Sequence, residues 1–339
     1  MILNSIFYHN IADFHSSGVG NMIHRYPRNV EISMTEGGRE MSRYACGTEL
    51  RLVAGSRVFV TVMAHRGEGG EAVVYCGDFQ HARHSLPKGE AVTIPLIAPE
   101  VFGRVTEEYT AGTRFSKNVW RIAFKNVMVS VLSVDAQGND ARPPYPWEMP
   151  AKKMLAYGSS ITHGAGALTS VDTYVEHLAR LLGCDVLNKG LGGACHCEPA
   201  VADYFVEELE WDFALMEVGV NMLGSVPVEE YEKRLRYLLE RVTATGKPIF
   251  LVNVYRFSRD YSITEGAEEQ KLRAYRETMR KVYADFADKN CYLIEGQEIL
   301  DRPEYLTTDG IHPSSYGHIM MGQNLAEKMK GKLQELGVL

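Results

Sequence analysis

Apolar residues follow different periodicities in the two halves of this chain. Residues 1 to about 142 contain short segments in which apolar and polar residues alternate or β-branched and aromatic residues predominate, and no long amphipathic helix interrupts them. Such segments predict β-strands over 57–64, 72–77, 90–96, 119–124 and 127–134. Many short strands favour an all-β domain over residues 1–142, a β-sandwich of jelly-roll type.

The pattern changes at the proline-rich stretch RPPYPWEMP, residues 142–150. Proline continues neither a helix nor the interior of a sheet, so residues 143–150 are predicted to form a linker. Beyond it, short apolar runs alternate with amphipathic stretches up to residue 339. Strands are expected over 153–158, 184–190, 212–219, 247–255 and 291–296, and helices over 174–182, 199–208, 228–245, 265–289 and after Pro313. Residues 151–339 are therefore predicted to be an α/β domain with a parallel five-stranded sheet and helices on both faces.

Residues with the chemistry of acyl transfer follow these predicted strands. Ser160 comes after the first strand, Asn221 after the third, and Asp309 and His312 before the last helix. In parallel sheets the loops at the carboxyl ends of the strands form the active site. A serine hydroxyl becomes a nucleophile when an imidazole accepts its proton, and a carboxylate orients that imidazole. The sequence thus predicts Ser160 as nucleophile, His312 as base and Asp309 as the orienting carboxylate.

The order of these motifs resembles that of the SGNH hydrolases, also called the GDSL esterase/lipase family. The motifs are GSS at 158–160, NKGLGG at 188–193, GVN at 219–221 and DGIH at 309–312. The resemblance covers about residues 151–339 and implies a flavodoxin-like, three-layer fold and a serine esterase that needs no metal or organic cofactor. It also implies an oxyanion hole formed by the backbone N–H groups of Ser160 and Gly193 and the side chain of Asn221.

The GSSITHG segment and the preceding β domain look like the two-domain SGNH esterases, several of which remove acetyl groups from carbohydrates. This likeness implies that the substrate is an O-acetylated sugar or oligosaccharide. The sequence departs from the family at two positions: Ser159 stands where the family has the aspartate of G-D-S, and Met222 where an aspartate follows the asparagine. Neither position transfers a proton, so these departures indicate a divergent branch and leave the expected activity intact. Ser159 is predicted to make a cap or turn hydrogen bond.

Each motif also has a structural interpretation. Ser160 is in a position to cap a helix, and Asp309 and His312 fit an ordinary Asp-Gly turn. A second D-x-x-H at 78–81 shows how easily such patterns arise. His163 and His196 are candidates for substrate contact, with a surface position the alternative for His163. Cys195, His196 and Cys197 are spaced too closely for the usual zinc ligand sets, so no metal is expected.

Three other functions can be compared with the motifs. An acyltransferase or thioesterase shares the acyl-enzyme and differs only in the acceptor. An inactive carbohydrate-binding protein would explain Ser159 and Met222. A nucleotide site at residues 158–166 is disfavoured because the P-loop lysine and the G-x-G-x-x-G pattern are absent. The G-x-S-x-G elbow of the α/β-hydrolases is absent as well.

Composition and charge indicate the class of protein and its cellular compartment. Hydrophobic residues make up 45% and charged residues 23% of the 339 residues, as in ordinary globular proteins. The formal net charge of −7 and the lack of a Lys/Arg-rich block argue against nucleic-acid binding. The amino terminus lacks the pattern of a secretory signal, and no apolar run reaches the ~20 residues that span a bilayer. The six scattered cysteines then fit a reducing compartment, so we expect a cytoplasmic enzyme. Homo-oligomerisation is left open.

Overall fold

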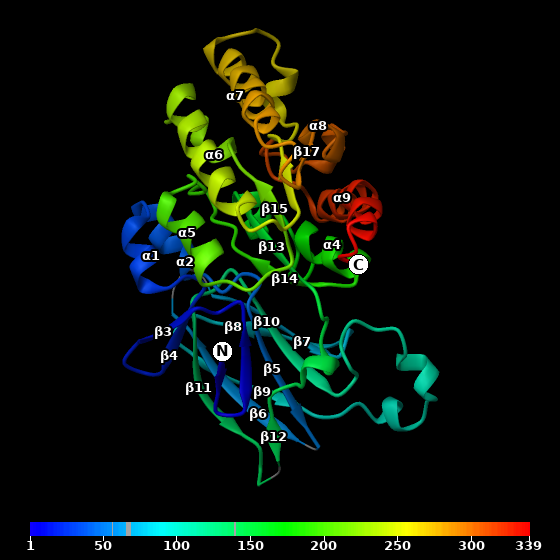
Figure 1. Cartoon of the computed structure of the whole chain (residues 1–339). Helices are drawn as coiled ribbons and strands as arrows, with labels where there is room; N and C mark the ends of the chain where they lie inside the picture. The colour runs from blue at the N-terminus through cyan, green and yellow to red at the C-terminus, as the bar shows by residue number, and fades with distance from the viewer. Residues whose placement is uncertain (56, 66–68, 139) are drawn as a thin grey trace. The chain divides into compact units, whose positions relative to one another are not determined.

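The computed structural model describes residues 1–55, 57–65, 69–138 and 140–339, which fold into two compact units (Figure 1). The first unit comprises residues 1–28, 42–151 and 169–171, and the second comprises residues 29–41, 152–168 and 172–339. The predicted linker, 143–150, lies within the first unit. Residues 29–41, which hold most of the short helices α1 (Arg28–Ser33) and α2 (Glu36–Ser42), belong to the second unit, and the sequence pattern does not indicate this.

The first unit consists of two antiparallel sheets. One sheet has the order β1-β2-β5-β10-β7-β8, with β12 paired to β5, and the other has the order β3-β4-β11-β6-β9. The strands are β1 (Ile2–Leu3), β2 (Ile6–His9), β3 (Asp13–Ser16), β4 (Asn21–His24), β5 (Glu49–Ala54), β6 (Val58–Ala64), β7 (Gly70–Cys76), β8 (Phe79–Leu86), β9 (Ala91–Leu96), β10 (Val119–Lys125), β11 (Val129–Asp135) and β12 (Ala141–Arg142). Side chains of both sheets share one hydrophobic core, among them Leu50, Val60 and Ile122. The predicted β-sandwich is therefore confirmed, while jelly-roll connectivity stays a prediction.

The strand β5 escaped the sequence analysis because charged side chains occupy its buried positions. Glu49 Oε2 accepts hydrogen bonds from Arg51 Nε at 2.7 Å and Arg121 Nε at 2.9 Å, and all three side chains are at most 4% exposed. Buried charges are tolerated where they are paired and hydrogen-bonded, so Glu49 and Arg51 occupy buried positions next to the core residues Leu50 and Leu52. The polar strand β8 escaped for the opposite reason, since it is an edge strand with a largely exposed surface.

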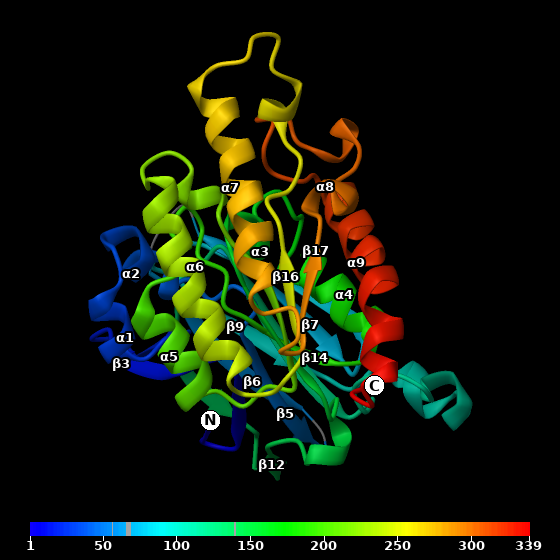
Figure 2. The same ribbon diagram turned by 45° about the horizontal axis from the view of Figure 1, so that its top comes forward.

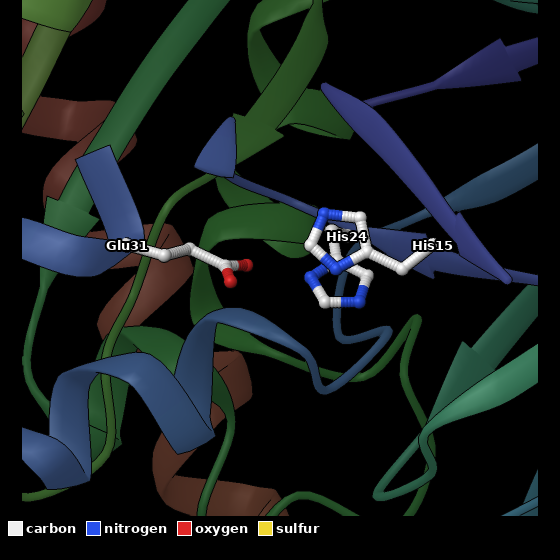
Figure 3. A group of neighbouring side chains, drawn as sticks. All are labelled: His15, His24 and Glu31. Atoms are coloured by element: carbon white, nitrogen blue, oxygen red, sulfur yellow. The ribbon is translucent and has the colours of Figure 1, made fainter. Parts of the chain in front are cut away.

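Two histidine rings lie against each other in the hairpin formed by β3 and β4. The ring centroids of His15 and His24 lie 3.8 Å apart (Figure 3), and His15 Nε2 lies 3.2 Å from Asp13 Oδ2. Asp13 pairs with His24 across the hairpin. Cross-strand side-chain pairs of this kind stabilise an edge hairpin.

The second unit contains a five-stranded parallel sheet of order β14-β13-β15-β16-β17. Its strands are β13 (Lys153–Gly158), β14 (Asp185–Asn188), β15 (Phe213–Glu217), β16 (Ile249–Val252) and β17 (Cys291–Ile294). Its further helices are α3 (Ser160–His163), α4 (Tyr174–Leu182), α5 (Pro199–Glu207), α6 (Val228–Thr243), α7 (Ala267–Ala284), α8 (Gly296–Ile299) and α9 (Ser315–Glu335). The second strand in sequence lies outside the first, which is the flavodoxin-like order, and this confirms the predicted fold class.

Helices cover both faces of this sheet. Helices α4 and α9 contact each other and share a hydrophobic core with Met154, Phe213 and Val252. Helix α6 contacts both α5 and α7 (Figure 2), and these three helices cover the other face. Four observed strands end two or three residues earlier than predicted, at 188, 217, 252 and 294. The chain leaves the sheet at these points, so the residues beyond them are free to form a site.

Two further observations concern apolar residues. Among the described residues, the structure contains no helix with the length and apolar character needed to cross a bilayer. Trp120 and Trp211 are buried, which fits a role in the core. Trp147 is 78% exposed and its ring stacks on Tyr145 at a centroid distance of 4.6 Å.

Candidate active site

Ser160 lies at the first position of α3, directly beyond the carboxyl end of β13. Ser159, and not Ser160, caps this helix: its hydroxyl accepts a hydrogen bond from Ile161 N at 3.2 Å. The predicted cap role of Ser159 is confirmed. The hydroxyl of Ser160, a partly buried residue, is left for another partner.

That partner is His312, from the loop that precedes α9. Ser160 Oγ lies 2.8 Å from His312 Nε2, and His312 Nδ1 lies 2.7 Å from Asp309 Oδ2. The three side chains form one hydrogen-bonded chain although 152 residues separate Ser160 from His312. An imidazole held this way has Nδ1 protonated towards the carboxylate and Nε2 free to accept the serine proton.

Asp309 also shapes the loop that carries the histidine. Its Oδ1 accepts hydrogen bonds from Ile311 N at 2.9 Å and His312 N at 3.0 Å. Burial alone would raise the pKa of Asp309, but these backbone N–H groups and the His312 ring outweigh it and hold the pKa well below its usual range. Asp309 is therefore ionised at neutral pH, as a carboxylate that stabilises an imidazolium must be.

A glycine brings the two loops together. A Cβ atom at Gly166 would lie 1.9 Å from the backbone oxygen of Pro313, next to His312, and Gly166 has φ of 87°. Any side chain there would push the α3 loop away from the histidine loop. Helix α9 adds a second link, because His318 Nε2 donates to the oxygen of Ala165 at 2.9 Å.

Side-chain amides connect the loops after β13, β14 and β15. Asn188 Nδ2 donates to the oxygen of Thr162 at 2.7 Å, and Asn188 Oδ1 accepts from Gly190 N at 2.9 Å. Asn221 Oδ1 accepts from Cys195 N at 3.1 Å. With its oxygen engaged, the Asn221 side chain keeps its Nδ2 donor for another acceptor.

The glycine-rich loop after β14 passes beside the serine. A Cβ atom at Gly192 would lie 3.8 Å from Ser160 Cβ. The next residue, Gly193, therefore follows a residue that is adjacent to the serine. Gly193 is exposed, has φ of 67° and has open space at its Cβ position. Its N–H group as an oxyanion donor stays a prediction.

The two candidate substrate contacts differ in exposure. His163 is buried, and its Nδ1 donates to the oxygen of Gly190 at 3.1 Å, so a surface position for His163 is wrong. His196 is partly exposed, and its backbone oxygen accepts from Arg234 Nη1 at 3.2 Å. Contact of either ring with substrate stays a prediction. The neighbouring thiol of Cys195 is buried, which raises its pKa and disfavours the thiolate that binds metals.

Sequence reasoning missed one side chain at this edge. Glu217, the last residue of β15, is 1% exposed, and its Oε2 accepts hydrogen bonds from Ser159 and Thr162. Its sequence signal is weak, because it stands at the end of the apolar run FALME. A buried acid at the carboxyl end of a central strand was the available clue.

A flavodoxin-like sheet with hydrogen-bonded Ser160, His312 and Asp309 at the carboxyl ends of its strands defines an SGNH-type hydrolase domain. Residues 151–330 match the GDSL-like Lipase/Acylhydrolase family, and the chain belongs to this family. A comparison with curated proteins gave no match.

Solved structures resemble the chain over both units. The salicylyl-acyltransferase SsfX3 from a tetracycline biosynthetic pathway has a TM-score of 0.80 at 18% identity, over 99% of this chain and 96% of that chain. A family two carbohydrate esterase from Clostridium thermocellum, in complex with cellohexaose, has a TM-score of 0.60 at 15% identity, over 98% and 100%. An acetyl xylan esterase from the rumen bacterium Butyrivibrio proteoclasticus has a TM-score of 0.55 at 12% identity, over 85% and 90%. At these identities the likeness establishes the fold.

Proposed function

We propose that this chain is a serine esterase that hydrolyses small acyl esters, with O-acetyl groups on a sugar or oligosaccharide as the substrate. The observation that carries the proposal is the hydrogen-bonded chain from Ser160 Oγ through His312 to Asp309 Oδ2. This arrangement favours an active enzyme over an inactive carbohydrate-binding protein. Membership of the acylhydrolase family supports the reaction class, and the carbohydrate esterases of the same fold support the substrate class.

The proposed reaction has two halves. Ser160 Oγ attacks the ester carbonyl carbon while His312 Nε2 accepts the hydroxyl proton, and His312 then gives this proton to the departing alcohol. In the second half, His312 takes a proton from water, which attacks the acyl-enzyme and releases the acid. His312 returns the proton to Ser160. Every proton transfer uses the same Nε2 atom, which lies 2.8 Å from Ser160 Oγ.

The negative charge of the tetrahedral intermediate requires donors near Ser160. We assign this role to the N–H groups of Ser160 and Gly193 and to Asn221 Nδ2. The hydrogen bond from Cys195 N to Asn221 Oδ1, at 3.1 Å, fixes which end of the amide accepts and supports this assignment. No metal or organic cofactor enters the reaction.

Replacing Asn221 by alanine should lower kcat by about 10²–10³, because one oxyanion donor contributes this much. Steady-state hydrolysis of p-nitrophenyl acetate measures the effect. Asn118→Ala, on an exposed residue directly before β10, is a matched control. An unchanged kcat for Asn221→Ala would remove this side chain from the oxyanion hole.

Incubation with acetylated xylo- and manno-oligosaccharides should release acetyl groups, seen by mass spectrometry as losses of acetyl mass units from the oligosaccharide. The Ser160→Ala variant is the control for spontaneous deacetylation. Absence of acetyl loss from all of them would contradict the proposed substrate.

An acyltransferase or thioesterase is the second candidate, and the whole-chain fold likeness to a salicylyl-acyltransferase supports it. Hydrolase and transferase share the acyl-enzyme and differ in what attacks it. Adding alcohols of increasing concentration to the p-nitrophenyl acetate assay separates them. Faster release of p-nitrophenol, with acetylated alcohol as product, would favour the transferase.

A further inference from the structure

A buried carboxylate holds the turn that carries Ser160. Glu217 Oε2 accepts three hydrogen bonds: from Ser159 N at 2.8 Å, from Ser159 Oγ at 2.8 Å and from Thr162 Oγ1 at 3.0 Å. The donors come from the residue before the nucleophile and from the residue two positions after it. One oxygen atom therefore fixes the backbone on both sides of Ser160.

The contacts continue into the helix and the core. Ser159 Oγ, which donates to Glu217, accepts from Ile161 N, and Thr162 Oγ1, which also donates to Glu217, lies 2.7 Å from Tyr174 Oη. Since Thr162 uses its proton towards Glu217, Tyr174 is the donor of that last contact. The turn is thus bound at Ser159, Ile161 and Thr162, while the Ser160 hydroxyl is left to His312.

The strand passes so close to the carboxylate that position 158 must be glycine. A Cβ atom at Gly158 would lie 2.6 Å from Glu217 Oε2 and 2.2 Å from Thr162 Oγ1. The residues of the G-S-S motif therefore form a turn and also contact Glu217 on β15. Its glycine admits the carboxylate and its first serine binds it.

The charge of Glu217 is not needed to balance a cation. Burial raises the pKa of Glu217 to about 7, against the lowering effect of the hydrogen bonds from Ser159 and Thr162. The titratable side chains that interact with it in the described part of the chain are Tyr174, Tyr255 and Cys195. Burial raises the pKa of each, so all three are neutral at neutral pH. An ionisable group kept in such surroundings is more typical of a functional site than of a core.

We propose that Glu217 is a positioning residue for Ser160 and that serine at position 159 is a consequence of Glu217. An aspartate at position 159, as in the G-D-S motif, would bring two carboxylates into contact, and two carboxylates in contact do not both ionise readily. Serine avoids this conflict and donates to the carboxylate instead. The kinetic consequences of this inference rest on the proposed function. Its structural consequence, the position of Ser160 relative to His312, does not.

The first test removes the ionisable group and keeps the shape. Glu217→Gln leaves one oxygen as a weaker, neutral acceptor for three donors, so the turn is expected to loosen. We expect kcat for p-nitrophenyl acetate to fall about tenfold to a hundredfold, with KM changed less than about threefold, because misplacing a nucleophile by a fraction of an ångström affects the reaction more than substrate binding. Glu208→Gln, on an exposed residue after α5, is the matched control.

The second test restores the aspartate. Ser159→Asp should lower kcat/KM at pH 8, and the ratio of variant to wild-type kcat/KM should rise as the pH falls to 6, because a proton shared by the two carboxylates relieves their repulsion. Adding Glu217→Gln to Ser159→Asp should raise kcat/KM at pH 8 by about tenfold, since the glutamine amide donates to the new carboxylate. If Glu217 had a merely structural role, the double variant would lose kcat/KM by the product of the two single-variant factors.

A crystal structure of each variant gives a readout that does not depend on ester hydrolysis. In Glu217→Gln and Ser159→Asp the Ser160 Oγ to His312 Nε2 distance, 2.8 Å in the wild-type chain, should exceed the hydrogen-bonding range of about 3.5 Å. If the wild-type chain hydrolyses no ester, the proposed function fails and this distance still decides the role of Glu217.

The proposal is overturned if Glu217→Gln keeps the wild-type kcat and distance, or if the double variant is no more active than Ser159→Asp. Should Glu217→Gln not fold, Ser159→Ala carries the test, because it adds no charge and removes the hydroxyl that donates to Glu217 and accepts from Ile161 N. Its kcat should fall about tenfold, and an unchanged kcat would also overturn the proposal.

Discussion

Replacing Ser160 by alanine is expected to lower kcat for p-nitrophenyl acetate by about 10⁵–10⁶, the largest effect of any single substitution in this chain. The hydroxyl is the atom that attacks, and His312 then has no proton to accept. Donors that bind the oxyanion remain, so the residual rate should stay above that of the reaction in water.

The measurement needs three parts to separate chemistry from folding. Thermal unfolding of Ser160→Ala should match that of the wild-type chain, because the residue is only partly buried and the cap of α3 is Ser159. Ser33→Ala, an exposed serine on α1, is the matched control and should keep full activity. Mass spectrometry of the wild-type chain quenched during turnover should find the acyl group on the peptide that contains Ser160.

Substantial turnover by Ser160→Ala, or an acyl group found on another residue, would contradict the nucleophile assignment. A reduced unfolding midpoint would attribute a lower kcat to loss of folded protein. The unfolding midpoint and kcat are therefore measured on the same preparation. Normal stability with lost activity is the outcome that supports the assignment.

The sequence was sufficient to predict the α/β fold of residues 151–339 because its strands are short apolar runs and its helices are amphipathic. Helix α4 occupies the predicted residues 174–182, and α5 differs by one residue at its end. The strand ends were predicted less well, since the residues directly after β14, β15 and β16 are buried like the strands themselves. The β half was harder to predict because β5 buries charges and β8 exposes polar residues.

The hydrogen-bonded residues Ser160, His312 and Asp309 could be singled out because each stands in a short motif at a predicted strand or helix end. The contacts that support these three residues could not be predicted from the sequence. Glu217 bonds Ser159 across 58 residues, and Asn188 bonds Thr162 across 26. Gly37, from the amino-terminal segment that joins the second unit, has its Cβ position 3.7 Å from Ala194 Cβ. Such contacts arise from the packing of loops, which no local pattern encodes.

Replacing Asp309 by asparagine is expected to lower kcat by about 10⁴ while the loop keeps its conformation. Asparagine retains an oxygen that accepts from Ile311 N and His312 N, as Asp309 Oδ1 does. Its amide nitrogen, however, donates where Asp309 Oδ2 accepts from His312 Nδ1 at 2.7 Å. The imidazole then protonates Nε2 and presents a donor to Ser160 Oγ, so it no longer serves as a base.

Comparison with Asp309→Ala and Asp288→Asn makes this test specific. Asp309→Ala loses the loop hydrogen bonds as well, so its unfolding midpoint should fall, whereas that of Asp309→Asn should not. Asp288→Asn makes the same chemical change at an exposed residue in the turn between α7 and β17 and should keep wild-type kcat. Because the hydrogen bonds of Asp309 hold its pKa well below the usual range, the wild-type carboxylate stays charged throughout pH 5–8. The loss in Asp309→Asn should therefore persist across that range, and recovery of activity at any pH within it would show that the tautomer of His312 is set by another group.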